Sequence, residues 1–244
     1  MQDKMKTRKT IYVFLTTMIL FVVQTFASRF SGVIADLFDY TIIDKDGIFM
    51  RVSVHHIVQM IIALLIINII GKTKKLNFRL KPKVNKKGMV YAGIFTVVIL
   101  IYVFISYFIG YKYNTIVPYE YELNMTNILG SLGFQLILSG TSEEILFRAL
   151  PITIIEVFLC GEEEKDDRLA IIITSMLFSI AHIKWTIFTL TVSFSLFQLI
   201  YAFVLGLIYA VTYIKSKSII YPMLMHGLSN FLMVGVGYLF AVMG

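Results

Sequence analysis

The chain has 244 residues, of which 58% are hydrophobic and 15% are charged, and it carries a formal net charge of +7. Soluble domains contain roughly 45–50% apolar residues, so this composition excludes an ordinary soluble domain and predicts a membrane protein with several spans. The positive charge does not indicate nucleic acid, because most of it lies in two short basic stretches beside hydrophobic runs, where it sets orientation and contacts anionic lipid. The single cysteine, Cys160, excludes an internal disulfide framework and is interpreted as a small apolar filler.

The N-terminal half contains three predicted spans: Ile11–Ala27, Val52–Ile70 and Met89–Ile109. The basic start and apolar run also have the layout of a signal peptide, but we interpret them as an uncleaved first span because more spans follow. Residues 71–87 carry eight basic residues and no acidic one. The positive-inside rule therefore predicts that this loop and the N-terminus are cytoplasmic. The Lys- and Ile-rich composition favours a bacterial plasma membrane.

Residues 127–160 form an apolar stretch with helical character that is unusually long. As one helix it would measure about 50 Å, which is too long for one untilted crossing of a hydrocarbon core of about 30 Å. We therefore expect a break or bend, with Gly140 and Pro151 as the candidates. Thr141 and Glu144 fit a capping box, which predicts that a helix restarts there.

The chain ends in three further predicted spans: Leu169–Ile183, Ser193–Tyr213 and Ile219–Met243. The acidic stretch Gly161–Arg168 is interpreted as a solvated loop, and Lys184 with Trp185 as an interfacial pair. The total is seven transmembrane helices, or eight if residues 127–160 form two. The sequence thus predicts an all-α, polytopic membrane helix bundle that forms a single integral-membrane domain over residues 1–244.

Two adjacent carboxylates and an arginine, Glu143, Glu144 and Arg148, stand inside an apolar run. Ionisable groups at membrane depth cost roughly 2.5–3.5 kcal/mol each by insertion scales, so by default they mark function. On a helix, Glu144 and Arg148 share a face and can pair, whereas Glu143 points about 100° away. A paired carboxylate beside an unpaired one predicts a structural acid and a working acid.

Three more polar residues lie within the last predicted spans: His182, His226 and Asn230. His226 and Asn230 are one helical turn apart on the same face. Taken singly, each is equally well explained by a helix–helix hydrogen bond. Together with Glu143 they lie at compatible depths, which favours one cavity in the cytoplasmic half of the membrane. Three ionisable residues near span ends are interpreted as interfacial and left out of the site: His55, His56 and Glu156.

Hydrolysis of an amide in a low-dielectric site requires a base that activates water and donors for the oxyanion. Glu143 can be the base, and His182 can hold the water or pass a proton. His226 and Asn230 can donate to the oxyanion. The alternative is a zinc ion held by Glu143, His182 and His226, with water in an open position. No HExxH pair is present, so zinc is the weaker alternative and no required cofactor is predicted.

Three motifs occur in a fixed order: Glu143-Glu144 with Arg148, Phe178 with His182, and His226 with Asn230. Within a polytopic protein this order resembles the CPBP family (CAAX protease and bacteriocin-processing, also called Abi) of intramembrane proteases. The resemblance covers the chain from Asn127 to the C-terminus, and the catalytic motifs lie within residues 141–230. It implies a helical bundle with a conical cavity that opens to the cytoplasm.

The resemblance also implies a role for each motif residue: Glu143 as the water-activating base, His182 beside it, Glu144 and Arg148 as structural support, and His226 with Asn230 as the oxyanion hole. Members of the family are often described as metalloproteases, and a metal-free glutamate mechanism is also proposed for them. The residue chemistry above favours the metal-free mechanism.

The sequence therefore predicts an intramembrane endopeptidase that cleaves a membrane-associated or short peptide or protein, such as a bacteriocin or a signalling peptide. Membrane lipid is the other expected partner, and nucleic acid is not expected. The alternative is a catalytically silent immunity or partner-binding protein that keeps the fold. Relatives of that kind often lose motif residues, and this chain keeps them all. A transporter is a third reading, against which the lack of internal repeats argues.

Overall fold

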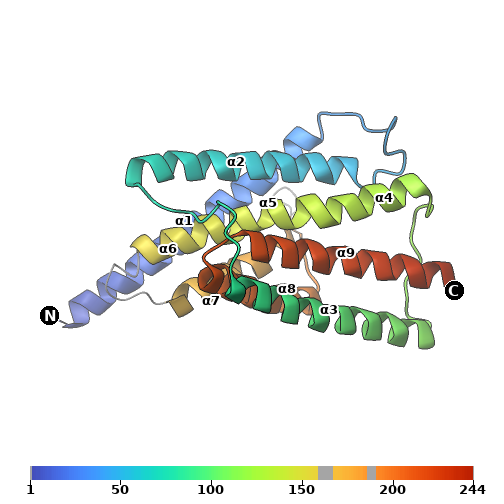
Figure 1. Cartoon of the computed structure of the whole chain (residues 1–244). Helices are drawn as coiled ribbons and strands as arrows, with labels where there is room; N and C mark the ends of the chain where they lie inside the picture. The colour runs from blue at the N-terminus through green and yellow to red at the C-terminus, as the bar shows by residue number, and fades with distance from the viewer. Residues whose placement is uncertain (1, 159–166, 186–190, 244) are drawn as a thin grey trace.

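The computed structural model describes residues 2–158, 167–185 and 191–243, so Cys160 and most of the predicted acidic loop lie outside the described residues. The described residues form a bundle of long helices with one short hairpin (Figure 1). The elements, with η for π-helix, are α1 (Gln2–Ala35), α2 (Met50–Lys74), α3 (Lys86–Lys112), α4 (Met125–Gly133), η1 (Phe134–Ser139), α5 (Gly140–Glu144), η2 (Ile145–Ala149), α6 (Leu150–Phe158), α7 (Asp167–Ile180), β1 (Lys184–Trp185), β2 (Val192–Ser193), α8 (Leu196–Ser216) and α9 (Ile220–Met243).

Within the described residues, five helices are long and apolar enough to cross a membrane: α1 over Thr10–Ala35, α2, α3, α8 and α9. This confirms the predicted all-α membrane class at the level of five spans. The two other predicted spans, residues 127–160 and 169–183, are not single long helices in the structure. The stretch from α4 to α6 is divided by two π-helical segments, and α7 has 14 residues. A crossing needs about 20 residues, so α7 is short for a span of its own.

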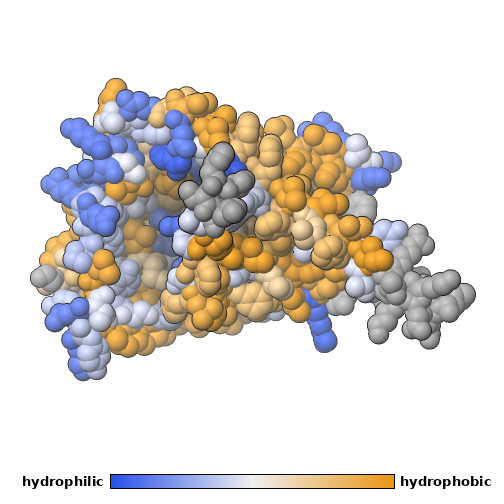
Figure 2. Space-filling view, turned by 180° about the vertical axis from the view of Figure 1, so that it is seen from behind, coloured by the Kyte–Doolittle hydropathy of each residue, from blue (hydrophilic) through white to orange (hydrophobic). Residues whose placement is uncertain are grey.

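The outward faces of the long helices are hydrophobic. Phe14 on α1 is 62% exposed and Ile94 on α3 is 61% exposed, and many similar side chains accompany them. In Figure 2 hydrophobic residues cover most of the middle of one face, and hydrophilic residues gather toward its ends. Because a soluble monomer rarely exposes so much contiguous apolar surface, these faces are assigned to lipid.

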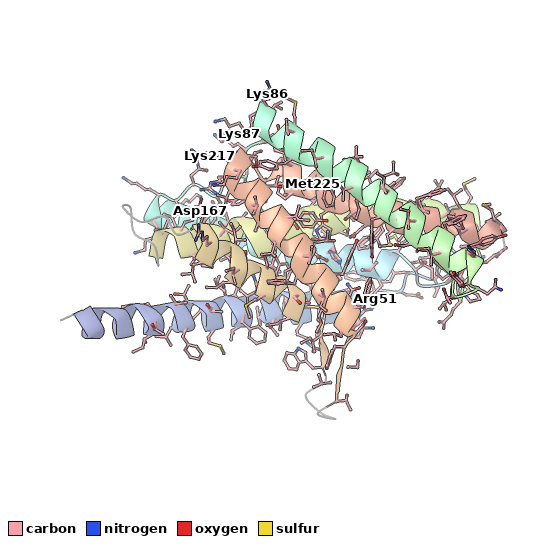
Figure 3. All side chains as sticks on the ribbon, turned by 90° about the horizontal axis from the view of Figure 1, so that it is seen from below. Arg51, Lys86, Lys87, Asp167, Lys217 and Met225 are labelled. Atoms are coloured by element: carbon pink, nitrogen blue, oxygen red, sulfur yellow. The ribbon has the colours of Figure 1, made fainter. Side chains whose placement is uncertain are left out.

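The basic loop after α2 and the turn between α8 and α9 meet at one end of the bundle. The Asn85 side chain donates a hydrogen bond to the carbonyl of Ser216 (2.9 Å), and the Lys83 amide donates to Ser218 Oγ (3.2 Å). Figure 3 accordingly shows Lys86, Lys87 and Lys217 together at this end. The basic segments that the positive-inside rule places on one side of the membrane therefore do lie on one side of the fold.

At the opposite end, a carboxylate sets the start of α2. Asp44 is buried and accepts hydrogen bonds from the amides of Ile48 (2.8 Å), Phe49 (2.8 Å) and Met50 (2.7 Å). Amides at the start of a helix have no partner within it, and the Asp44 carboxylate accepts their hydrogen bonds. Its negative charge also interacts favourably with the positive end of the helix dipole. Arg51 donates to Asp36 (2.6 Å), and this hydrogen bond lowers the pKa of Asp36 below its usual value.

The predicted helix restart at Thr141 is wrong. Ser139 and Gly140 both have right-handed helical dihedral angles, so the backbone runs through this point without a break. The Thr141 hydroxyl donates back to the carbonyl of Ile137 instead of capping a new helix. π-helical segments lie on either side, η1 before Gly140 and η2 just before Pro151, and their wider turns hold extra residues without ending the helix.

Two glycines let this long helix cross α9 in backbone contact. A Cβ atom on Gly227 would lie 2.4 Å from the carbonyl oxygen of Leu136, and one on Gly140 would lie 2.6 Å from the amide nitrogen of Gly227. Real Cβ atoms do not approach backbone so closely, so any larger residue forces the helices apart. The crossing lies beside Glu143 and His226, and it therefore sets how close their helices come.

We expect Gly227→Ala to lower the free energy of unfolding by about 1–3 kcal/mol, because the added methyl group overpacks the crossing. The measurement is thermal or denaturant unfolding of the purified protein in detergent. Gly235→Ala on the same helix is the matched control, since its Cβ would meet only the Leu132 side chain, at an ordinary 3.5 Å. Equal stability of the two variants would contradict the proposed tight crossing.

Candidate active site

A cavity of about 280 Å³ lies among η1, α5, α7, α8 and α9. The four residues that the sequence assigned to water activation and oxyanion binding all line it: Glu143, His182, His226 and Asn230. They come from three separate helical regions of the chain. Two polar residues that the sequence analysis did not select, Gln135 and Gln198, line the same cavity, as does Tyr201.

The two adjacent glutamates have different surroundings, as the sequence predicts. The side chain of Glu144 is fully buried, and its Oε1 lies 3.2 Å from Arg148 Nη1 and 2.8 Å from His226 Nδ1. The side chain of Glu143 keeps 21% of its surface exposed and faces the cavity. Glu144 is thus engaged in structural contacts, whereas Glu143 is accessible to a small molecule such as water.

Arg148 is buried completely and holds several helices together. Its guanidinium lies over the ring of Phe178 on α7, 4.1 Å from the centroid, and 5.4 Å from that of Tyr209 on α8. Aromatic faces attract a cation, and the attraction grows when water is excluded. Tyr209 also stacks on His226 (5.2 Å between centroids) and shares a hydrogen bond with Ser229 (2.9 Å). Arg148 therefore joins the motif helix to α7, α8 and α9 around Glu144.

Hydrogen bonds determine the tautomers of both cavity imidazoles. Glu144 can only accept when it is ionised, so the Nδ1 of His226 is the donor in their bond. His182 Nδ1 likewise donates to the carbonyl of Phe178 (2.9 Å). In the neutral form, the Nε2 of each ring is therefore an acceptor. His226 Nε2 lies 3.8 Å from Glu143 Oε2.

One hydrogen bond fixes the side chain of Asn230 and leaves one of its two N–H groups free to donate. Its Nδ2 donates to Ser139 Oγ (2.9 Å), and the Ser139 hydroxyl in turn donates to the carbonyl of Gln135 (3.1 Å). The Asn230 amide nitrogen carries two hydrogens, so one remains for another acceptor. Since Asn230 lines the cavity, that second N–H is a candidate oxyanion donor.

His56 is buried near Glu143 and is not the interfacial residue that was predicted. It is 8% exposed, its Nδ1 lies 2.7 Å from Ser142 Oγ, and its Nε2 lies 3.8 Å from Glu143 Oε1. The sequence placed it near the end of a span, where a histidine is ordinarily interfacial. No local pattern reveals that α2 packs against α5, and this packing is what brings His56 to Glu143.

Glu156 is also not the interfacial residue that was predicted. It is buried and forms an ion pair with Arg79 of the basic loop. The Nη2 of Arg79 lies 3.0 Å from Oε1 and 2.8 Å from Oε2 of Glu156. Arg79 also lies over the ring of Tyr213 (5.1 Å). This pair ties the loop after α2 to α6, and it lies outside the cavity.

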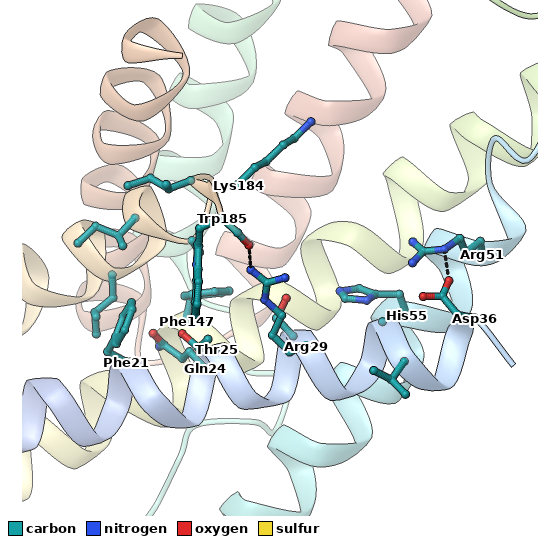
Figure 4. A pocket seen from close by; sticks show the side chains of 17 residues that line it. Phe21, Gln24, Thr25, Arg29, Asp36, Arg51, His55, Phe147, Lys184 and Trp185 are labelled. Carbon is teal, nitrogen blue, oxygen red and sulfur yellow. Dashed lines mark hydrogen bonds and ion pairs between the residues drawn. The ribbon is translucent and has the colours of Figure 1, made fainter. Parts of the chain in front are cut away.

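A larger groove of about 550 Å³ lies between α1 and the end of α7 (Figure 4). The guanidinium of Arg29 donates to the carbonyl of Trp185 and lies over its ring, 4.5 Å from the centroid. His55 points toward this groove in Figure 4, together with the Arg51–Asp36 pair. The neighbouring histidines of α2 contact each other edge-on, with 5.3 Å between ring centroids, but His55 lines the groove whereas His56 lies beside Glu143.

The zinc alternative requires Glu143, His182 and His226 to converge on one point. In the part of the chain that the structure describes, no group of three His, Cys, Asp or Glu side chains is arranged to hold a metal ion. Glu143, His182 and His226 therefore do not form a zinc site in this arrangement, and the proposed reaction uses none.

Comparison with known proteins agrees with the motifs. Residues 125–232 match a family model described as type II CAAX prenyl endopeptidase Rce1-like. No curated protein and no solved structure matches the chain. The matched segment runs from the start of α4 into α9 and contains all six predicted site residues. The chain is therefore a multi-pass membrane protein whose residues 125–232 are similar to the Rce1-like family of type II CAAX prenyl endopeptidases.

Proposed function

We propose that the chain is an intramembrane endopeptidase that hydrolyses a peptide bond with water activated by Glu143. One observation carries the proposal: the partly exposed Glu143 carboxylate shares a cavity with two imidazoles and an amide donor, whereas its neighbour Glu144 is buried against Arg148 and His226. A general base must be unpaired, reachable by water and close to groups that orient that water. Of the two motif glutamates, only Glu143 meets these conditions.

In the proposed reaction, Glu143 removes a proton from water while the water oxygen attacks the carbonyl carbon of the substrate. The Nε2 of neutral His182 accepts the second hydrogen of the water and so orients it. The carbonyl oxygen becomes an oxyanion, which accepts from the free N–H of Asn230. When the tetrahedral intermediate collapses, the C–N bond breaks and the protonated Glu143 returns its proton to the leaving amine.

His226 can donate to the oxyanion, as the sequence predicts, only in one protonation state. Its Nδ1 already donates to Glu144, so its Nε2 carries a hydrogen only when the ring is an imidazolium. His226 therefore donates to the oxyanion in its protonated form, with the carboxylate of Glu144 balancing the charge. In its neutral form its Nε2 carries no hydrogen and cannot donate to the oxyanion.

The proposed substrate is a membrane-associated or short hydrophobic peptide or protein, for instance a bacteriocin or a signalling peptide. Apolar side chains of α8 and α9, among them Leu205, Met233 and Val234, line the cavity beside the polar residues and suit an apolar peptide. The proposed location is a bacterial plasma membrane with the N-terminus in the cytoplasm, supported by the basic end of the fold. A silent immunity or partner-binding protein is the alternative function.

The test is cleavage of membrane-anchored and short peptides by the purified protein in proteoliposomes. Products are identified by mass spectrometry in H₂¹⁸O, where hydrolysis places one heavy oxygen in the new carboxyl group. We expect cleavage by the wild type and none by Glu143→Gln. A chelator such as EDTA is expected to leave the rate unchanged, because no step uses a metal. Loss of activity with chelator and recovery with zinc would favour the metal alternative, and absence of any cleavage would favour the silent protein.

A further inference from the structure

The Glu143 carboxylate is approached from two sides by imidazoles of different helices. His226 Nε2 lies 3.8 Å from Oε2, and His56 Nε2 lies 3.8 Å from Oε1. Both distances are too long for a direct hydrogen bond, and each ring attracts the carboxylate strongly when it is protonated. His226 lines the cavity, whereas His56 does not. His56 therefore faces Glu143 from behind the reacting side.

The orientation of His56 is set by its other contacts. Ser142 Oγ holds its Nδ1 at 2.7 Å, and Ser142 is itself fully buried and bonded to the carbonyl of Ser139 (3.3 Å). The ring of Phe134 packs against His56 edge-on, with 5.0 Å between centroids. Because Ser142 is the residue before Glu143, it ties the backbone at the base to the imidazole that faces the base.

His56 lies on α2, and the family match covers only residues 125–232. Neither the matched segment nor its motifs include it. We propose that His56 is a positioning residue, which acts through Ser142 and Glu143 to hold the carboxylate of the base in the cavity, so that the N-terminal part of the chain completes the site. This inference rests on the proposed function, and it adds to it a residue from outside the protease motifs.

The two ring nitrogens can be separated by substitution. The amide of asparagine reaches about as far as Nδ1 and can keep the contact with Ser142, whereas the longer glutamine places an amide near the position of Nε2, toward Glu143. We expect His56→Asn to lower kcat by about 10–100-fold with little change in KM, because a base displaced by an ångström loses this much. We expect His56→Gln to retain most of the wild-type kcat.

The matched control is His55→Asn, one residue away on the same helix and at the groove of Figure 4. It is expected to leave kcat unchanged. If His56→Asn and His56→Gln have equal kcat values, or if both merely lower the unfolding temperature, the ring serves packing and the positioning role is overturned.

A second measurement needs no substrate and separates this inference from the proposed function. The unfolding temperatures of His56→Asn, of Glu143→Gln and of the double variant form a double-mutant cycle. Coupling between the two side chains makes the effects non-additive, as expected if His56 acts on Glu143. Additive effects would overturn the inference even in an active protease. A protein that cleaves nothing but shows the coupling would overturn the proposed function and leave the His56–Glu143 interaction standing.

Discussion

Glu143→Gln is expected to lower kcat by about 10²–10⁴-fold, the range that a positioned general base contributes. Glutamine has nearly the same shape as glutamate, but its amide cannot take a proton from water. No direct hydrogen bond to Glu143 is needed by either neighbouring imidazole, since both stand 3.8 Å away. The variant should therefore fold and insert as the wild type does, with KM little changed.

The measurement is single-turnover cleavage of a peptide in proteoliposomes, with the unfolding temperature determined on the same preparations. Glu156→Gln is the matched control, because Glu156 is also a buried glutamate but pairs with Arg79 away from the cavity. It should cost stability and leave the chemical step unchanged. Full activity of Glu143→Gln in a folded protein would remove Glu143 as the base and with it the proposed mechanism.

Arg148→Met is expected to cost about 3–5 kcal/mol of unfolding free energy, because it leaves the buried Glu144 without its cation. Neither side chain of this pair has any exposed surface, so no solvent can replace the lost partner. Methionine keeps an apolar stem between the rings of Phe178 and Tyr209 but loses the cation–π attraction. Activity should fall as well, since Glu144 also holds His226.

Chemical unfolding in detergent measures the loss. A rescue variant distinguishes an uncompensated charge from simple loss of packing: Arg148→Met combined with Glu144→Gln should recover part of the stability, because the unpaired carboxylate is then gone. If the double variant is less stable than Arg148→Met alone, the cost is one of packing and the ion pair is not its cause.

The residues of the candidate site could be chosen from the sequence because charge in an apolar run is costly and therefore conspicuous. Glu143, Glu144, Arg148, His182, His226 and Asn230 all stand in such runs, and the helical period alone separates the paired Glu144 from the free Glu143. The membrane class followed in the same way from the length and apolar character of the spans.

The long segment from α4 to α6 shows where local reasoning failed. Gly140 and Thr141 are ordinary signs of a helix boundary, yet the helical backbone continues through both. Gly140 permits the crossing with Gly227, and π-helical turns absorb the rest. A glycine that ends a helix and one that admits a neighbouring backbone look alike in sequence, because only the neighbour distinguishes them.

The sequence by itself determined the membrane class, the choice of the six motif residues and the pairing of Glu144 with Arg148, because periodicity and the cost of buried charge act along one helix. Only the tertiary structure decided which helices meet. It brought His56 of α2 to Glu143 and Arg79 to Glu156, and it settled which nitrogen of His182 and His226 donates. Those outcomes depend on packing between segments far apart in the chain, for which one sequence carries no local signal.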